Sequence, residues 1–254
     1  EKGWITLEKR VVGRDPFKED IILPTKPLDL TRHQAEALAT IINGVDAGEG
    51  NTVLLHGVTG SGKTEVYLQA IDHCLAKGLE AIVLVPEIAL TPQTCGRFRA
   101  RFGEEVSVLH SGLSDGERFD EWTKINEGRT RIVVGARSAL FAPFRHLGLI
   151  VVDEEHENTY KQDEIPRYNA RDVAVVRGRM EKATVVLGTA TPALESYYNC
   201  ELKKYTLTEL PERVDDQRMP LMEVVDMAAE ASLRGGAQIF SRRLEDLVKE
   251  RLSN

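Results

Sequence analysis

The feature that most constrains this chain is a glycine-rich stretch, GVTGSGKT, at residues 57–64, which fits the pattern G-x-x-x-x-G-K-[ST]. The apolar run at residues 52–56 before it predicts a buried strand, and the apolar periodicity after it predicts a helix that ends at Gly78. Glycines let successive backbone N–H groups turn toward phosphate oxygens, and the N-terminus of the following helix faces the same charge. The sequence therefore predicts a phosphate-binding loop (P-loop) between a strand and a helix.

The P-loop pattern predicts ATP with Mg²⁺ as the ligand and gives its residues separate roles. Lys63 is expected at the β- and γ-phosphates, and Thr64 at the Mg²⁺. The expected nucleotide-binding residues of the loop are Gly57, Thr59, Gly60, Ser61, Gly62, Lys63 and Thr64.

A second apolar run, at residues 149–152, ends in acidic side chains. In this position Asp153 would hold the Mg²⁺ through water, and Glu154 would orient the water that attacks the γ-phosphate. Acidic groups at such a strand end are costly unless a cation meets them. Lys63, Asp153 and Glu154 are therefore predicted catalytic residues, and Thr64 and Asp153 the predicted metal ligands.

Apolar β-type runs alternate with helical patterns over residues 30–210, which is typical of β-α-β units and a parallel sheet with helices on both faces. Ser114 and Glu117 form a capping box that predicts a helix running to about residue 127. The predicted strands are residues 52–56, 81–85, 106–109, 131–134, 149–152 and 184–187. The fold class is thus α/β.

The two ends of the chain differ from this centre. Residues 4–8 and 10–14 resemble two strands of a hairpin, and prolines punctuate the segment that follows. After residue 210 the pattern weakens, and a final helix is predicted from Ser241. We therefore expect three divisions: residues 1–24, a nucleotide-binding domain at 25–213, and a connector at 214–254.

Composition limits the possible partners. The net charge of −7 argues against binding nucleic acid by bulk electrostatics, so contacts with it would have to be local. No apolar run approaches the roughly 20 residues that a membrane span needs, and we expect a cytoplasmic protein with no membrane partner. Cys74, Cys95 and Cys200 show no metal-binding spacing and are expected to be buried thiols.

At this point the sequence resembles superfamily 2 helicases and translocases. Residues 153–156 read DEEH, which resembles the family's D-E-x-H box. Residues 85–93 resemble motif Ia, residues 135–144 resemble motif Ib, and residues 188–192 resemble motif III. Residues 31–34 resemble the upstream motif that recognises adenine.

The resemblance implies roles for further residues. Gln34 would offer its side-chain amide to the adenine base, and His156 would act in the ATPase site. His156 would also pass the nucleotide state to motif III, through Thr189 and Thr191. The residues implied to contact single-stranded DNA from motifs Ia and Ib are Pro86, Glu87, Arg137 and Ser138.

The chain resembles the PriA family of primosomal replication-restart helicases. The segments that carry this resemblance are residues 57–67, 85–88, 110–114, 135–141 and 153–156. This resemblance implies a RecA-like lobe, preceded by the end of a winged-helix DNA-binding domain and followed by the start of a second lobe. It further implies a 3′→5′ DNA helicase of the bacterial nucleoid that restarts stalled forks. The implied partners are forked and single-stranded DNA, single-strand-binding protein and other primosome proteins.

The resemblance also implies that this chain is part of a longer protein. A second lobe would supply an arginine to the ATPase site, and zinc would bind only in a part that is not present here. We therefore expect these 254 residues alone to bind Mg·ATP or Mg·ADP, but to hydrolyse ATP weakly or not at all and not to unwind DNA.

Residues 160–172 resemble the aromatic-rich loop of that family, which senses DNA beside the ATPase site. Tyr160 and Tyr168 offer rings on which bases can stack, and Lys161 and Arg167 offer phosphate contacts. Some relatives carry a tryptophan near Pro166, which this chain lacks.

Two other functions stay open. A double-strand DNA translocase or restriction-type ATPase of the same superfamily would share the P-loop and the acidic strand end. An ATP-gated scaffold for replication proteins would share nucleotide binding without motor activity.

Overall fold

The computed structural model describes residues 23–214, 222–234, 236 and 239–252. The chain divides into two units, residues 1–216 and 217–254, which are described separately. The hairpin strands expected at residues 4–8 and 10–14 lie outside the described residues.

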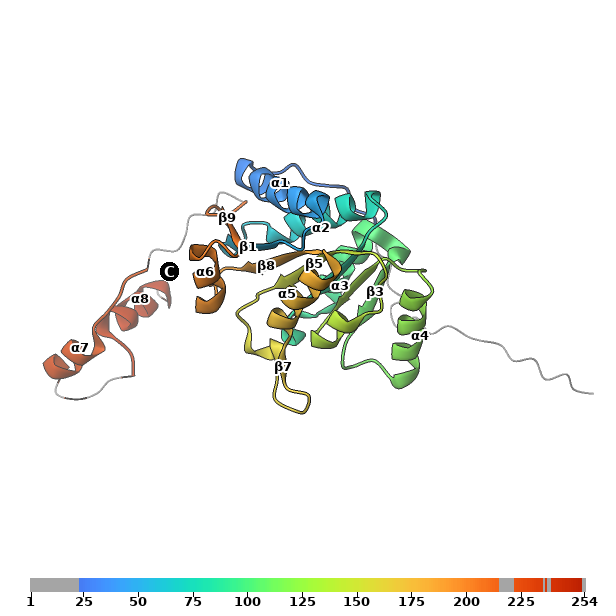
Figure 1. The fold of residues 1–254 in the computed structure, drawn as a ribbon. Coiled ribbons are helices and arrows are strands. Elements are labelled where there is room, and N and C mark those ends of the chain that lie inside the picture. The colour runs from blue at the N-terminus through green and yellow to red at the C-terminus, as the bar shows by residue number, and fades with distance from the viewer. Residues whose placement is uncertain (1–22, 215–221, 235, 237–238, 253–254) are drawn as a thin grey trace, which may run out of the picture. The chain divides into compact units, whose positions relative to one another are not determined.

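A seven-stranded parallel sheet forms the centre of the first unit, in the order β3-β4-β2-β5-β8-β1-β9 (Figure 1). Every neighbouring pair in it is parallel, as the alternating pattern predicts. Its strands are β1 (Thr52–Gly57), β2 (Glu80–Leu84), β3 (Val106–Leu109), β4 (Ile132–Gly135), β5 (Leu147–Asp153), β8 (Thr184–Thr189) and β9 (Thr206–Leu210). Six of these strands were predicted, and β9 was not.

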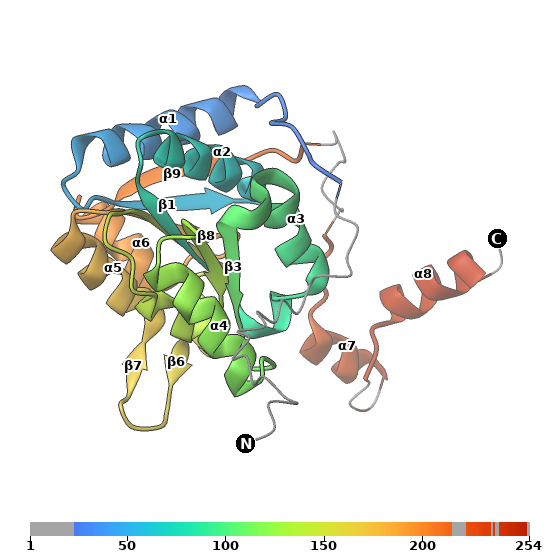
Figure 2. The same ribbon diagram turned by 90° about the vertical axis from the view of Figure 1, so that its right-hand side faces the viewer.

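Helices cover both faces of this sheet (Figures 1 and 2). The capping box predicted for the helix after Ser114 is present: the Ser114 side chain accepts from the Glu117 backbone, and the Glu117 side chain accepts from the Ser114 backbone. The helices are α1 (Arg32–Ala47), α2 (Lys63–Ala76), α3 (Pro92–Phe102), α4 (Asp115–Asn126), α5 (Ala170–Glu181) and α6 (Leu194–Glu201).

Two apolar clusters form the core, one on each face of the sheet. Alternate residues of β1 enter different clusters: Val53 and Leu55 pack with α1, α2 and α3, whereas Leu54 packs with α4 and α5. Because the central strands are buried on both faces, their sequences are mainly apolar. Of the three free cysteines, Cys74 and Cys95 are buried and Cys200 is partly exposed.

A small antiparallel hairpin leaves the sheet after β5. The short helix η4 (Asn158–Tyr160) leads into β6 (Lys161–Gln162), which pairs with β7 (Tyr168–Asn169). The loop expected at residues 160–172 is therefore a hairpin for part of its length.

The second unit contains α7 (Met227–Arg234) and α8 (Arg242–Leu252). The final helix predicted from Ser241 is confirmed, because Ser241 accepts a hydrogen bond from Leu244 at the start of α8. Helix α7 was not predicted. No helix in the described part of the chain is long and apolar enough to cross a membrane.

Candidate functional site

The P-loop and the acidic strand end meet at one edge of the sheet. The loop follows β1, Asp153 ends β5, and β8 lies between these two strands. Ligands of open parallel sheets bind at the carboxyl ends of the strands, where these residues lie. A pocket of about 830 Å³ opens there, and its lining includes the P-loop residues 59–64, Asp153 and Glu154.

Lys63 is held at the base of this pocket. Its side chain is only 9% exposed, and its Nζ donates to the backbone oxygen of Gly57 at 2.9 Å. The same Nζ lies 3.7 Å from a carboxylate oxygen of Glu154. A buried ammonium needs such oxygen partners, and phosphate oxygens can take their place.

Gln34 forms a hydrogen bond with the backbone of the P-loop. Its Nε2 donates to the Ser61 oxygen at 2.8 Å, and its Oε1 accepts from the Thr31 backbone N–H at 2.8 Å in the capping box of α1. Gly62, next in the loop, has a φ of 79°, and a side chain there would overlap the Gln34 amide. Both ends of this amide are therefore engaged within the protein, and adenine recognition by Gln34 stays a prediction that requires one of these bonds to be exchanged.

Asp153 and Glu154 form a pair of neighbouring acids at the edge of the pocket. Burial, followed by the nearby charge of Glu154, raises the pKa of Asp153 to about 6. The hydroxyl of Tyr67 donates to Asp153 Oδ1 at 3.0 Å and favours the charged form. Glu154 stands in a left-handed turn with φ 47°, just past the strand.

These residues fit a bound Mg²⁺. Thr64 and Asp153 line the same pocket, and a desolvated acid with a raised pKa gains from a nearby cation. Among the described residues no group of three His, Cys, Asp or Glu side chains is placed to hold a metal alone. An ion here would thus take phosphate and water oxygens as its other ligands, which is the habit of Mg²⁺ in nucleotide sites.

His156 joins the acidic motif to the end of β8. Its Nδ1 lies 2.8 Å from Thr189 Oγ1, and its Nε2 lies 3.4 Å from Thr191 Oγ1. Thr189 Oγ1 also accepts from the Thr191 backbone N–H at 3.0 Å. The structure brings together the three residues expected to couple nucleotide state to motif III, and the coupling itself stays a prediction.

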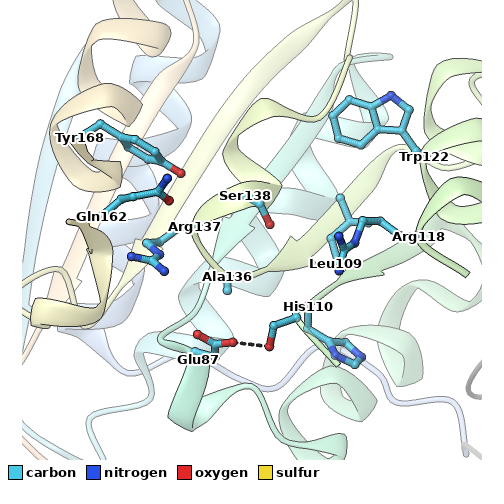
Figure 3. A pocket seen from close by; sticks show the side chains of 11 residues that line it. Glu87, Leu109, His110, Arg118, Trp122, Ala136, Arg137, Ser138, Gln162 and Tyr168 are labelled. Carbon is cyan, nitrogen blue, oxygen red and sulfur yellow. Dashed lines mark hydrogen bonds between the residues drawn. The ribbon is translucent and has the colours of Figure 1, made fainter. Parts of the chain in front are cut away.

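A second pocket, of about 250 Å³, lies beside the ends of β3 and β4; we call it the Ia–Ib pocket. Figure 3 shows Tyr168 and Gln162 of the β6–β7 hairpin on one side of it and Trp122 and Arg118 of α4 on the other. The residues that line it are Glu87, Leu109, His110, Ser111, Arg118, Trp122, Ala136, Arg137, Ser138, Gln162 and Tyr168. Three expected DNA-contacting residues of motifs Ia and Ib, together with Tyr168, therefore gather around one hollow.

Two contacts fix the hairpin side of the Ia–Ib pocket. The guanidinium of Arg137 donates to the backbone oxygen of Lys161. The ring of Tyr168 packs edge to face against that of Phe141, with the ring centroids 5.5 Å apart. Lys161 and Arg167 are exposed on the hairpin, where Arg167 Nε donates to the backbone oxygen of Asp163 at 2.9 Å.

The residues on the α4 side of the pocket were not predicted from the sequence. Arg118 and Trp122 are four residues apart on one helix and so share a face. The Ser114 capping box already fixed where this helix begins, and it could have revealed that face. The position of α4 beside motif Ib depends on the pairing of β3 with β4, which no local sequence pattern shows.

The structure corrects two expectations about DNA contact. Tyr160 is only 1% exposed, and its hydroxyl donates to the backbone oxygens of Asp153 at 2.6 Å and Leu84 at 3.2 Å. Its ring packs in the core and cannot stack on a base. Pro86 is also buried, and its backbone oxygen accepts from Ala89 at 2.8 Å, so it shapes the start of motif Ia without facing solvent.

A parallel sheet that carries a P-loop after one strand and an acidic pair after another, with a third strand between them, defines a RecA-like P-loop ATPase lobe. The family model described as DEAD/DEAH box helicase matches residues 31–199. The chain belongs to this family.

Individual relatives show a more specific similarity than the family model does. The replication restart protein PriA of Bacillus subtilis is 50% identical over 253 residues, which cover 100% of this chain and 31% of that protein. PriA of Chlamydia trachomatis is 48% identical over 231 residues, covering 91% of this chain and 30% of that protein. The resemblance to PriA seen in the motifs is confirmed, and the chain spans about a third of the length of these relatives.

Solved structures show the same fold. RecG bound to a three-way DNA junction matches with a TM-score of 0.56 and 21% identity, covering 76% of this chain and 25% of that one. The Pyrococcus furiosus Hef helicase domain matches with a TM-score of 0.50 and 23% identity, covering 72% and 38%. These likenesses support the α/β, RecA-like fold.

Proposed function

We propose that this chain is the ATP-binding motor lobe of a 3′→5′ DNA helicase that restarts stalled replication forks and promotes primosome assembly. The observation that carries the proposal is the single pocket that Lys63, Thr64, Asp153 and Glu154 share. The similarity to PriA proteins over the whole chain supports the replication-restart assignment.

The residues of the pocket divide the work of phosphoryl transfer. Lys63 exchanges its bond to Gly57 for the β- and γ-phosphates, and Glu154 accepts the proton of the attacking water. Thr64 and Asp153 would hold Mg²⁺, which neutralises charge on the phosphates. An arginine from a second lobe would complete the site, so the 254 residues alone should bind nucleotide but turn it over weakly.

The Ia–Ib pocket is the proposed DNA-contacting surface of this lobe. Trp122 and Tyr168 supply ring faces on which bases can stack, and Arg118 and Arg137 supply positive charge. These local groups let a chain with a net charge of −7 hold DNA. Forked and single-stranded DNA, single-strand-binding protein and primosome proteins are the proposed partners, and the bacterial nucleoid is the proposed location.

Replacing Lys63 by Ala in the intact protein should abolish strand separation on forked DNA. The loss follows because the small side chain leaves the β- and γ-phosphates without their cation. ATP-dependent release of a labelled strand from a fork measures the effect, and Lys204→Ala, which removes an exposed lysine that lines neither pocket, is the control. ATP-driven movement of the unaltered protein along duplex DNA without strand release would instead favour the translocase. Fork restart that survives in Lys63→Ala would favour the scaffold.

Replacing Trp122 by Ala should weaken binding of single-stranded DNA by about 1–3 kcal/mol, the usual contribution of one stacked base. Phe119 is the matched control, because it lies on the same helix, is 70% exposed and does not line the pocket. Fluorescence anisotropy with a labelled oligonucleotide measures both variants. Equal affinities for Trp122→Ala and Phe119→Ala would remove the Ia–Ib pocket from the DNA path.

A further inference from the structure

Tyr67 lies one helical turn after Lys63 on α2, and it is not part of the P-loop pattern. Residues four apart on a helix share a face, so both side chains point to the same edge of the sheet. The hydroxyl of Tyr67 donates to Oδ1 of Asp153 at 3.0 Å, 86 residues away in sequence.

This hydroxyl is enclosed. Tyr67 is 1% exposed, and a buried phenol needs a hydrogen-bond partner. A phenol carries its proton at neutral pH and an ionised carboxylate can only accept, so the Tyr67 hydroxyl is the donor in this contact.

Gly188 provides the room for this hydroxyl. It pairs with Asp153 in the register between β5 and β8, and a Cβ at Gly188 would overlap the Tyr67 hydroxyl. The Gly188 backbone oxygen accepts from the Glu155 N–H at 3.0 Å, which holds the two strand ends together. The first residue of motif III thus forms the wall against which Tyr67 holds Asp153.

Tyr160 offers a comparison for the hydrogen bond between Tyr67 and the side chain of Asp153. Its buried hydroxyl bonds only backbone oxygens in the described contacts, including that of Asp153 at 2.6 Å. Two buried tyrosines therefore contact the same acid, Tyr160 at the main chain and Tyr67 at the carboxylate. A tyrosine that only filled the core would not need the carboxylate as its partner.

We propose that Tyr67 is a positioning residue, whose hydroxyl orients the carboxylate of Asp153 for Mg·nucleotide and is itself located by Gly188. This inference rests on the proposed function, because it takes Asp153 as the residue that meets Mg²⁺. Oriented by this hydroxyl, the carboxylate of Asp153 would accept from a water of the ion. Without it the carboxylate can rotate, and the preference for Mg-bound nucleotide falls.

The test compares Tyr67→Phe with Tyr160→Phe in the intact protein. The affinity for a fluorescent ADP analogue is measured with Mg²⁺ and again with EDTA, and the ratio of the two affinities reports the metal contribution. For Tyr67→Phe we expect this ratio to fall about tenfold, as for loss of one hydrogen bond to a charged group. The affinity in EDTA should not change, because the P-loop is untouched. Tyr160→Phe should keep the ratio of the unaltered protein.

Other results overturn the inference. An unchanged ratio in Tyr67→Phe would show that Asp153 does not depend on the hydroxyl, and equal losses with Mg²⁺ and with EDTA would show a general structural role. A fall of the same size in Tyr160→Phe would also contradict it, since any buried hydroxyl near Asp153 would then suffice. If the unaltered protein bound the analogue equally well with and without Mg²⁺, the proposed function would fail first.

Discussion

Replacing Glu154 by Gln should lower ATP turnover of the intact protein by about 10²- to 10⁴-fold, the usual contribution of a general base. The amide keeps the size of the side chain but cannot take a proton from water. Affinity for Mg·nucleotide should change little, because Lys63 stays available to the β- and γ-phosphates and Asp153 is unaltered. Single-turnover hydrolysis with saturating DNA measures the chemical step, and equilibrium binding of an ADP analogue measures affinity.

Glu157→Gln is the matched control for this experiment. Glu157 and Glu154 are equally exposed, at 34%, and each lies within 4 Å of a nitrogen of His156, at 3.9 and 3.7 Å. Only Glu154 also approaches Lys63, at 3.7 Å. Turnover that falls equally in both variants would assign the effect to charge around His156 and would contradict the role of Glu154 as the base.

Features set by neighbouring residues could be predicted from the sequence. The six buried strands could be recognised because both of their faces are covered, so most of their positions are apolar. The missed strand β9 is an edge strand whose residues are mostly part-exposed or exposed, so it lacks that signal. The P-loop and the Ser114 capping box depend on residues within a few positions of each other, and both were found.

Features set by distant residues could not be predicted. The sequence of the hairpin suggests two tyrosines available to bases, but Tyr160 turns inward to reach Leu84, 76 residues earlier. The sequence suggests that the Gln34 side chain is available to adenine, but in the structure its amide donates to the backbone oxygen of Ser61, 27 residues later. In each case the fold brings a backbone oxygen to a side chain whose type alone suggested a ligand.

The four residues of the acidic motif, 153–156, also have contacts with distant residues that the sequence could not predict. Asp153 receives the Tyr67 hydroxyl, Glu154 turns toward Lys63, and His156 reaches Thr189. A turn with a left-handed residue at its second position sends neighbours in different directions, so adjacency in sequence does not imply a shared role. Glu155, the residue for which the sequence suggested no task, has the most complete set of partners.

Replacing Glu155 by Ala should therefore destabilise the fold by about 3–5 kcal/mol, as expected when one partner of a buried ion pair is removed. The Glu155 side chain is 0% exposed and lies 3.3 Å from the guanidinium of Arg171, which is 11% exposed. Its oxygens also accept from the Ala193 backbone at 2.7 Å, before α6, and from the Ser196 hydroxyl at 2.8 Å. Removing the carboxylate leaves the Ala193 N–H and the Ser196 hydroxyl without their acceptor, and it leaves Asp172, at 2.9 Å, as the close acidic partner of the Arg171 guanidinium.

Urea unfolding followed by circular dichroism measures this loss, and Glu195→Ala is its control. Glu195 lies 3.9 Å from the same Arg171 nitrogen but is 74% exposed, so its removal should cost less than about 1 kcal/mol. Similar unfolding midpoints for the two variants would mean that Asp172 is a sufficient partner for Arg171 and that the bonds of Glu155 contribute little. Because the carboxylate of Glu155 holds the start of α6 beside the end of β8, we also expect Glu155→Ala to lower ATP turnover, through displacement of Thr189 and Thr191 from His156.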